Sequence, residues 1–178
     1  MKVIETKLKD CVIIEPKVLG DERGFFLETF QAERYAAEAG ITLPFVQDNH
    51  SRSSRGVLRG LHFQINKPQG KLVRVVKGKV YDVAVDIREG STTFGQWDAV
   101  VLSEENKIQL WVPPGFAHGF VVLSETADFE YKCTDYYDPF DEGSILWNDP
   151  DLNIPWPTDD PNLSDKDANA EKLVDLKR

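Results

Sequence analysis

The sequence predicts an all-β fold, a jelly-roll sandwich or barrel with a few short peripheral helices. Three observations predict it. Short apolar segments recur roughly every ten residues along the chain. Twelve glycines and ten prolines punctuate the spaces between them. The segment 79–87 alternates with the period of two that is typical of a strand.

The expected strands each combine apolar or β-branched residues with a flanking turn signal. In chain order they are Val12–Glu15, Phe25–Phe30, Phe45–Asn49, Val57–Gln64, Lys71–Val76, Lys79–Ile87, Trp97–Leu102, Ile108–Val112, Gly119–Leu123 and Phe129–Thr134. Within the sixth of these, Val83, Val85 and Ile87 share one face, opposite a face that carries two aspartates. This pattern predicts a strand that is half-buried.

Turns and helices are fewer. The Asp-Glu-Arg-Gly segment Asp21–Gly24 predicts a turn, and Gln31–Ala39 predicts a helix that ends at Gly40. Ser164 and Asp167 resemble a capping box, which predicts a helix to about Leu176. A chain of 178 residues is the size of one domain, so residues 1–178 are expected to form one, with about 150–178 packed as an extension.

The composition argues against several classes of protein. The net charge of −9 argues against a protein that binds a nucleic-acid backbone. Apolar runs do not exceed four residues, whereas a membrane helix needs about 20, so we expect no contact with a membrane. The N-terminus has no apolar stretch of a signal peptide. Cys11 and Cys133 are too few for a disulfide framework, which predicts reduced thiols and a cytoplasmic location.

The charge is unevenly distributed. The stretch Asn49–Tyr81 contains no acidic residue. Its eight basic residues are Arg52, Arg55, Arg59, Lys67, Lys71, Arg74, Lys77 and Lys79. Such a region is either a site for a small anion, such as a phosphate or nucleotide, or a solvated basic face.

His62 is the first candidate for chemistry. On a regular strand Arg59, Leu61 and Phe63 share one face, and His62 points to the other with its neighbour Gly60. Histidine suits proton transfer near neutral pH. The alternative is a structural histidine that is hydrogen-bonded in the core.

A second histidine lies in a shaped turn. Pro113, Gly115 and His118 fit the P-x-G-x-x-H half of the cupin signature, which makes the expected jelly roll cupin-like. Metal-binding cupins add an H-x-H pair and a glutamate, whereas the earlier strand here offers only His62. We therefore expect no bound metal, and a metal-dependent dioxygenase is the alternative within this fold.

Three further side chains have both a chemical and a structural interpretation. Lys71 follows Gly70 and either neutralises an oxyanion or is simply solvated. Tyr131 alternates with apolar neighbours and either exchanges a proton in a cavity or packs in the core. Asp167 either orients a histidine or caps the C-terminal helix.

Taken together, six segments resemble the dTDP-4-dehydrorhamnose 3,5-epimerase family of cupin-type sugar-nucleotide enzymes. They run in the family's order along nearly the whole chain. The segments are Gly20–Phe26, Phe45–Ser51, Val57–Gln64, Gln69–Arg74, Gly115–Phe120 and Gly143–Asp149. The resemblance implies epimerisation at C3 and C5 of dTDP-4-dehydro-6-deoxy-D-glucose to dTDP-4-dehydro-L-rhamnose.

The resemblance also implies residue roles. His62 would be the general base with Asp167 as its partner, Tyr131 the opposing acid, and Lys71 the cation beside the C4 keto oxygen. Eight positions match substrate contacts: Arg23, Glu28, Gln47, Asn49, Arg59, His118, Glu142 and Lys166. The resemblance further implies that the reaction uses no cofactor or metal, and that the protein is a homodimer in which N-terminal strands are exchanged.

The chemistry is consistent with these residue types. Inversion of a carbon next to a ketone requires removal of its proton and return of one to the other face, with the charge held on the ketone oxygen as an enolate. Two alternatives stay open at this point. One is a single-carbon epimerase or ketoisomerase on the same class of dTDP-4-keto sugars, and the other is a non-catalytic cupin that binds sugar nucleotides.

Overall fold

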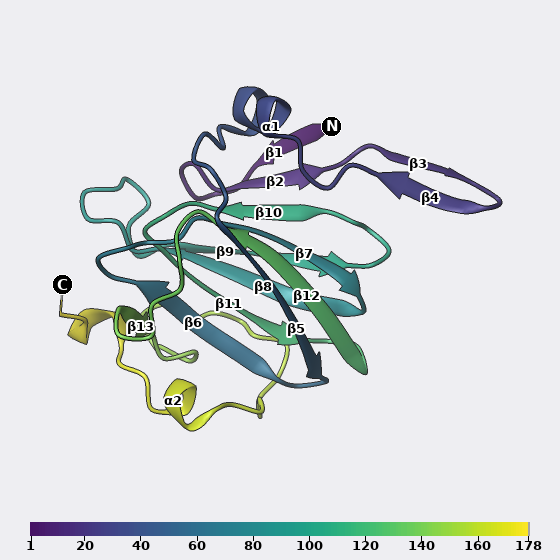
Figure 1. Cartoon of the computed structure of the whole chain (residues 1–178). Coiled ribbons are helices and arrows are strands. Elements are labelled where there is room, and N and C mark those ends of the chain that lie inside the picture. The colour runs from purple at the N-terminus through teal and green to yellow at the C-terminus, as the bar shows by residue number, and fades with distance from the viewer. Residues whose placement is uncertain (178) are drawn as a thin grey trace.

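The computed structural model describes residues 1–177 as two β-sheets that pack face to face in a jelly roll (Figure 1). The six-stranded sheet has the order β1 (Lys2–Glu5), β2 (Val12–Glu15), β10 (Gln109–Val112), β7 (Lys71–Lys77), β12 (Thr126–Cys133) and β5 (Gln47–Ser54). The five-stranded sheet has the order β13 (Glu142–Ser144), β6 (Leu58–Gln64), β11 (Phe116–Val122), β8 (Lys79–Asp86) and β9 (Trp97–Ser103). The jelly roll expected from the sequence is therefore confirmed.

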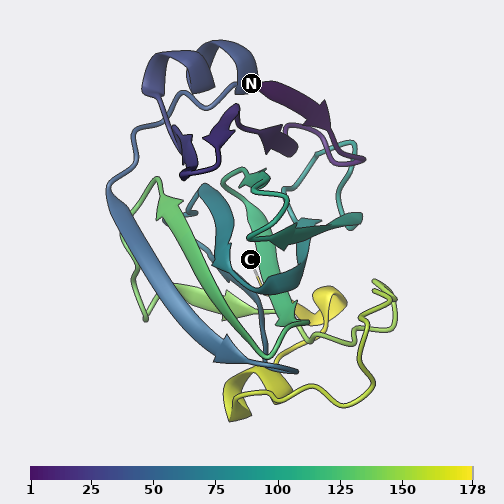
Figure 2. The ribbon, with the colours of Figure 1, turned by 90° about the vertical axis from the view of Figure 1, so that its right-hand side faces the viewer.

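Apolar side chains form three clusters. One lies between the sheets and includes Val73, Phe120 and Phe129 from strands of both. The second packs the outer face of the five-stranded sheet against the C-terminal segment, through residues such as Val83 and Trp156. A third lies under helix α1. Figure 2 shows α1 and the yellow C-terminal segment on opposite sides of the two sheets.

Strand β8 is buried on both faces, so the prediction of a half-buried strand is wrong there. Val83–Asp86 are all buried. The strand lies between β11 and β9, and its odd-numbered side chains are covered by the C-terminal segment. Its even-numbered residues face the space between the sheets, where Ala84 packs in the core. Burial of Asp82 and Asp86 is possible because His118 and Arg88 are placed to bind them.

Helix α1 (Ala32–Ala39) forms where expected. The Gln31 side chain accepts a hydrogen bond from the Arg34 amide, and Gly40 ends the helix with a φ of 71°. Helix α2 covers only Asp165–Ala168, so the predicted extension to about Leu176 is wrong. The backbone of Glu171 instead accepts a hydrogen bond from the Leu146 amide, and a 3-10 turn, η1 (Leu173–Asp175), follows.

Three strands escaped the sequence analysis: β1, β3 (Val18–Asp21) and β13. They have three or four residues and little apolar alternation. Strands β3 and β4 (Gly24–Leu27) form a hairpin around the predicted turn, and it extends away from the sandwich (Figure 1). Within residues 1–177 no helix has the length and apolar character needed to span a membrane.

Candidate active site

A cavity of about 530 Å³ lies between the two sheets, and both sheets supply its walls. Most of the side chains that the sequence singled out line it. They are Gln47, Asn49, Arg59, His62, Lys71, His118, Tyr131 and Glu142. Polar and apolar atoms line the cavity in similar amounts, and the cavity is open to solvent, so a charged small molecule can enter it.

His62 forms one wall of the cavity from strand β6. Its Nε2 lies 2.7 Å from Oδ1 of Asp167, a residue 105 positions further along the chain. The single turn of α2 holds this aspartate, since the Asp167 amide donates to the Ser164 hydroxyl at its N-cap. The second oxygen of Asp167 accepts a hydrogen bond from the Gly60 amide. Asp167 therefore both belongs to a capped turn and orients a histidine.

The Asp167 carboxyl is buried, with 3% of its surface exposed. Burial by itself would raise its pKa, but the hydrogen bonds from His62 and the Gly60 amide outweigh burial and hold the pKa below its usual value. The carboxylate is therefore ionised at neutral pH and accepts a hydrogen bond from Nε2, so the neutral form of the ring carries its proton on Nε2. This leaves Nδ1 as the nitrogen with a free lone pair.

Arg59 also lines the cavity, and here simple alternation along the strand fails. In the pairing of β6 with β11, three steps from Arg59 to His62 oppose two steps from Phe120 to His118. This bulge lies at Gly60, whose φ of 128° suits glycine. The extra residue turns Arg59 to the same side as His62, while Leu61 packs in the outer cluster.

The opposite wall carries Tyr131 and Lys71. They come from the paired strands β12 and β7 of the six-stranded sheet, and the Lys71 Nζ lies 5.7 Å from the centroid of the Tyr131 ring. Burial lowers the pKa of Lys71. Burial also raises the pKa of Tyr131, although a hydrogen bond with Asn49 opposes this. A buried lysine and a phenol that keeps its proton at neutral pH thus face His62 across the cavity.

His118 lies beside His62, as its direct partner in the pairing of β11 and β6. It is 6% exposed, its Nε2 lies 2.9 Å from both oxygens of the fully buried Asp82, and its ring stacks on Phe129. The buried carboxylate fixes the orientation of this ring. His118 is therefore a rigid part of the cavity wall.

Four residues of the predicted set lie outside the cavity lining: Asp167, which binds His62 in the cavity wall, and Arg23, Glu28 and Lys166. Arg23 is at the tip of the exposed hairpin, where it pairs with Asp21, and Glu28 pairs with Arg34 near α1. Lys166 stands behind the cavity wall, with its Nζ 2.6 Å from Oε2 of Glu142. Within a single chain, Lys166 therefore lies next to the site through its contact with Glu142, whereas Arg23 and Glu28 lie away from the site.

The predicted set lacks several lining residues, and Tyr137 is the one that bears on the chemistry of the site. Tyr137 follows strand β12, lines the cavity and donates a hydrogen bond of 2.8 Å to Glu142. The only sequence signal for it was an aromatic pair in a loop, Tyr136 and Tyr137. The Gln64 side chain holds this loop in place, because it donates a hydrogen bond to the Tyr136 carbonyl and accepts one from the Asp138 amide.

The basic stretch Asn49–Tyr81 does not form a single patch. Arg59 and Lys71 line the cavity. Arg52 pairs with Asp128, and Arg74 pairs with Glu130. Arg59 and Lys71 therefore fit the interpretation as a site for a small anion, whereas Arg52 and Arg74 fit the interpretation as a basic face.

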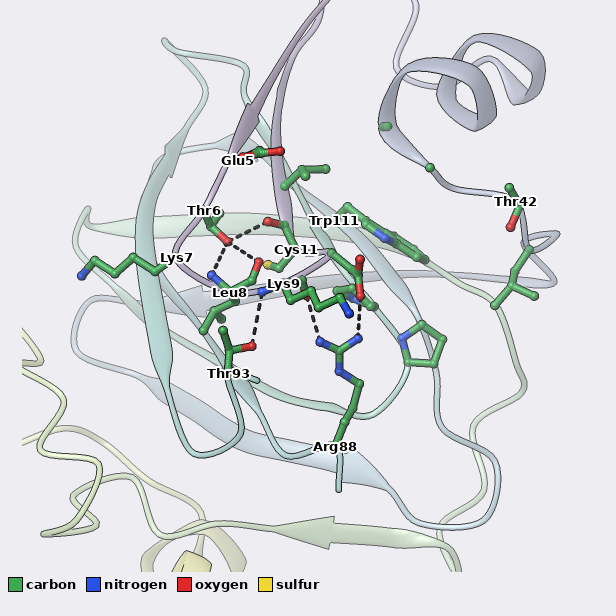
Figure 3. Close-up of a pocket in the computed structure, with 17 residues that line it drawn as sticks. Glu5, Thr6, Lys7, Leu8, Lys9, Cys11, Thr42, Arg88, Thr93 and Trp111 are labelled. Carbon is green, nitrogen blue, oxygen red and sulfur yellow. Dashed lines mark hydrogen bonds and ion pairs between the residues drawn. The ribbon is translucent and has the colours of Figure 1, made fainter. Parts of the chain in front are cut away.

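A larger cavity of about 780 Å³ lies at the base of the β1–β2 hairpin, against Arg88 and the loop after α1 (Figure 3). Arg88, the least exposed cation of its lining, is already neutralised. Arg88 donates to Asp86 and Asp10 and to the Lys9 carbonyl. A cation with its donors occupied offers little to an anionic ligand, so size alone does not mark this cavity as the functional site.

Metal ligands do not gather in the described part of the chain. Among residues 1–177 no three His, Cys, Asp or Glu side chains are placed to hold one ion. Each of the three histidines has an aspartate as its partner instead. A jelly roll whose cavity sets a histidine–carboxylate pair against a tyrosine and a lysine defines the class of cupin-type enzymes that work by acid–base chemistry.

Comparison with known proteins gives the family within that class. The family model for dTDP-4-dehydrorhamnose 3,5-epimerase matches residues 5–175. The enzyme of that name from Shigella flexneri is 57% identical over 98% of this chain and 97% of its own. The chain belongs to the dTDP-4-dehydrorhamnose 3,5-epimerase family and is an isomerase.

Solved structures support the same family assignment. The 3,5-epimerase from Legionella pneumophila, in complex with dTDP-4-keto-L-rhamnose, superposes with a TM-score of 0.96 at 60% identity, over 99% of this chain and 94% of that one. A 3′-monoepimerase from Streptomyces bikiniensis in complex with dTDP-quinovose has a TM-score of 0.89 at 35% identity, over 96% and 87% of the chains. Since both kinds of enzyme share the fold, the fold alone does not set how many carbons react.

Proposed function

We propose that this protein epimerises C3 and C5 of dTDP-4-dehydro-6-deoxy-D-glucose, giving dTDP-4-dehydro-L-rhamnose. The observation that carries the proposal is the opposition of His62, paired with Asp167, to Tyr131 and Lys71 across one cavity. The names of relatives at 52–59% identity and the sugar nucleotide in the Legionella complex support it.

The first step is removal of a proton. Nδ1 of His62 takes the proton from the carbon next to the C4 ketone, and the electron pair of that bond moves to the ketone oxygen. Asp167 holds the Nε2 proton and stabilises the imidazolium that forms. Lys71 presents its ammonium group to the enolate oxygen, and burial of this lysine strengthens the interaction.

The second step returns a proton from the other face. Tyr131 donates its phenolic proton to the same carbon, and the enolate electrons restore the ketone. The product is the inverted carbon, with His62 protonated and Tyr131 deprotonated. Transfer of one proton to solvent from His62 and one from solvent to Tyr131 resets the site for the other carbon.

The remaining cavity residues bind the substrate. Arg59, with its Nε on the Ser53 hydroxyl, offers its guanidinium to the diphosphate. Gln47, Asn49, His118 and Glu142 contact the sugar and nucleotide, and Lys166 acts beside Glu142. The reaction uses no cofactor. One domain spans residues 1–178, because the C-terminal extension delivers Asp167 to the cavity between the sheets. The cytoplasmic location stays a prediction.

A homodimer accounts for Arg23 and Glu28, which are distant from the cavity of their own chain. The β3–β4 hairpin that carries Arg23 exposes Val18, Leu19, Phe25 and Phe26. Apolar side chains on a projecting hairpin are typical of an interface with a second copy. In the dimer the hairpin of one protomer reaches the site of the other.

Solvent deuterium exchange tests the function. The substrate is incubated with the protein in D₂O, and NMR locates the label. We expect deuterium at both C3 and C5. Label at one carbon supports a single-carbon epimerase, the activity named for the Streptomyces relative. Absence of label supports a cupin that only binds the sugar nucleotide.

A further inference from the structure

His62 has a carboxylate at each of its ring nitrogens. Asp167 holds Nε2, and Oε1 of Glu142 lies 3.9 Å from Nδ1. Glu142 reaches this position from the edge strand β13, which pairs with β6 so that Ser144 opposes His62. Its side chain is 12% exposed, so water only partly screens its charge.

Two neighbours fix the direction of the Glu142 carboxylate. Lys166 Nζ lies 2.6 Å from Oε2, and the Tyr137 hydroxyl donates to the same oxygen at 2.8 Å. Both contacts use Oε2, which turns Oε1 toward the imidazole. The hydrogen bonds from Lys166 and Tyr137 outweigh the effect of burial and lower the pKa of Glu142, so this carboxylate is ionised at neutral pH.

The location of the negative charge matters because Nδ1 is the nitrogen that gains the proton. Asp167 keeps the Nε2 proton of the neutral ring, so the proton taken from carbon arrives at Nδ1. At 3.9 Å the contact with Oε1 is too long for a direct hydrogen bond. It is a charge interaction that favours the imidazolium over the neutral ring.

We infer that Glu142 is the charge partner of His62 Nδ1 during proton abstraction, and that Lys166 and Tyr137 are positioning residues that keep its carboxylate on the ring. The inference rests on the proposed function, in which His62 is the base. It assigns Glu142 a role beyond contact with the substrate. The alternative is that Glu142 only binds the sugar nucleotide.

Several ionisable groups surround His62, and two of them, Asp167 and Glu142, contact its ring directly. The ionisable groups that contact the ring, line the same cavity or pair with such a group include Asp167 and Lys166 of α2, Glu142 of β13, Arg59 of β6, Lys71 of β7, Tyr131 of β12, Asp48 and His50 of β5, the His118–Asp82 pair of β11 and β8, and Tyr137. Only Asp167 and Glu142 form recorded contacts with the ring within residues 1–177. Lys166 acts on His62 through Glu142, and its positive charge opposes the effect of that carboxylate on the ring.

An NMR titration of the substrate-free protein, labelled with ¹⁵N-histidine, tests the inference. The wild-type His62 is expected as the Nε2–H tautomer. In Glu142→Gln the midpoint of its titration is expected to fall by about 1 pH unit, since the imidazolium loses a nearby anion. In Lys166→Gln the midpoint is expected to rise, because Glu142 is no longer neutralised. Tyr137→Phe keeps every charge and is expected to give the smallest shift.

The chain contains a matched control. His50 lies between Asp128 and Glu130 with its Nδ1 3.8 Å from Glu130 Oε1, and Arg74 takes Oε2 of Glu130. Glu130→Gln is expected to move the His50 midpoint and to leave His62 unchanged. The inference is overturned by an Nδ1–H tautomer of wild-type His62, by an unmoved midpoint in Glu142→Gln, or by shifts of the same sign in Glu142→Gln and Lys166→Gln.

Turnover separates the two roles of Glu142. The acidic limb of the pH profile of kcat/KM reports the free enzyme. We expect it to move to lower pH in Glu142→Gln, by the amount seen in the titration. A higher KM with an unmoved limb would instead mean a substrate contact alone, and would overturn the inference. The NMR titration needs no turnover, so failure of the proposed function in D₂O does not decide it.

Discussion

His50 and His62 have nearly the same neighbours in two different regions of the molecule. Each has an aspartate on Nε2, at 2.9 and 2.7 Å, and a glutamate oxygen near Nδ1, at 3.8 and 3.9 Å. In each case a cation takes the other glutamate oxygen. A histidine–carboxylate arrangement is therefore not by itself a mark of catalysis.

The two regions differ in what surrounds the ring. His50 is on the edge strand β5, with its side chain 53% exposed, and Arg52 shares Asp128 with it. His62 is 30% exposed in a cavity, where Tyr131 and Lys71 face it from the other sheet. Function depends on an opposing acid and cation in a partly dehydrated space. His50 also borders the cavity, but its exposed ring is held between Asp128 and Glu130.

The largest expected effect is that of His62→Ala, for which His50→Ala is the control. His62→Ala is expected to lower kcat by at least about 100-fold and to abolish deuterium exchange at both carbons, since the base is gone. Binding of dTDP, measured by calorimetry, is expected to survive. His50→Ala, its matched control, is expected to leave kcat unchanged. Exchange at a normal rate in His62→Ala would rule out this base.

Tyr131→Phe is expected to have a smaller and more selective effect, because it removes the acid and leaves the base. Proton abstraction at His62 continues, so substrate still acquires deuterium, while the share of inverted product falls. The measurement is the ratio of label in recovered substrate to label in product. Tyr136→Phe, a change in an exposed side chain, is the control. A wild-type ratio in Tyr131→Phe would contradict its assignment as the acid.

The sequence predicted those parts of the site that depend on regular strands. Tyr131 shares its face with Phe129, and Lys71 shares its face with Val73, so period-two alternation places both on the inner face of the six-stranded sheet. The jelly roll, the helix before Gly40 and most strand positions follow from similar local patterns. These features are local, so composition and spacing are sufficient to predict them.

Other parts depend on irregular or distant structure. The bulge at Gly60 moves Arg59 into the cavity, against the alternation that predicts the opposite. The partner of His62 arrives from a single turn of helix 105 residues away, and the local pattern left Asp167 open between orienting a histidine and capping a helix. Tyr137 and the conformation of Glu142 depend on a loop and a three-residue strand without a pattern. Tertiary packing decides such positions, and no local signal records them.

The smallest effect concerns stability and compares the two aspartates directly. Hydrogen bonds from Arg52 and then His50 lower the pKa of Asp128 from 3.8 to about 2, against the opposing effect of burial. A lowered folded-state pKa means that the ionised carboxylate stabilises the protein above about pH 4, and that this contribution is lost as the pH falls from 4 towards 2.

Replacement of Asp128 by Asn removes this contribution without a change of shape. We therefore expect Asp128→Asn to have a lower Tm than the wild type above pH 4, and the gap to narrow as the pH falls towards 2. Asp167→Asn is expected to follow the same direction, since the pKa of Asp167 is also lowered. The two variants differ in turnover, because only Asp167 holds the base. A difference in Tm between Asp128→Asn and the wild type that does not change with pH would show that the pairing of Asp128 with Arg52 and His50 does not stabilise the folded protein.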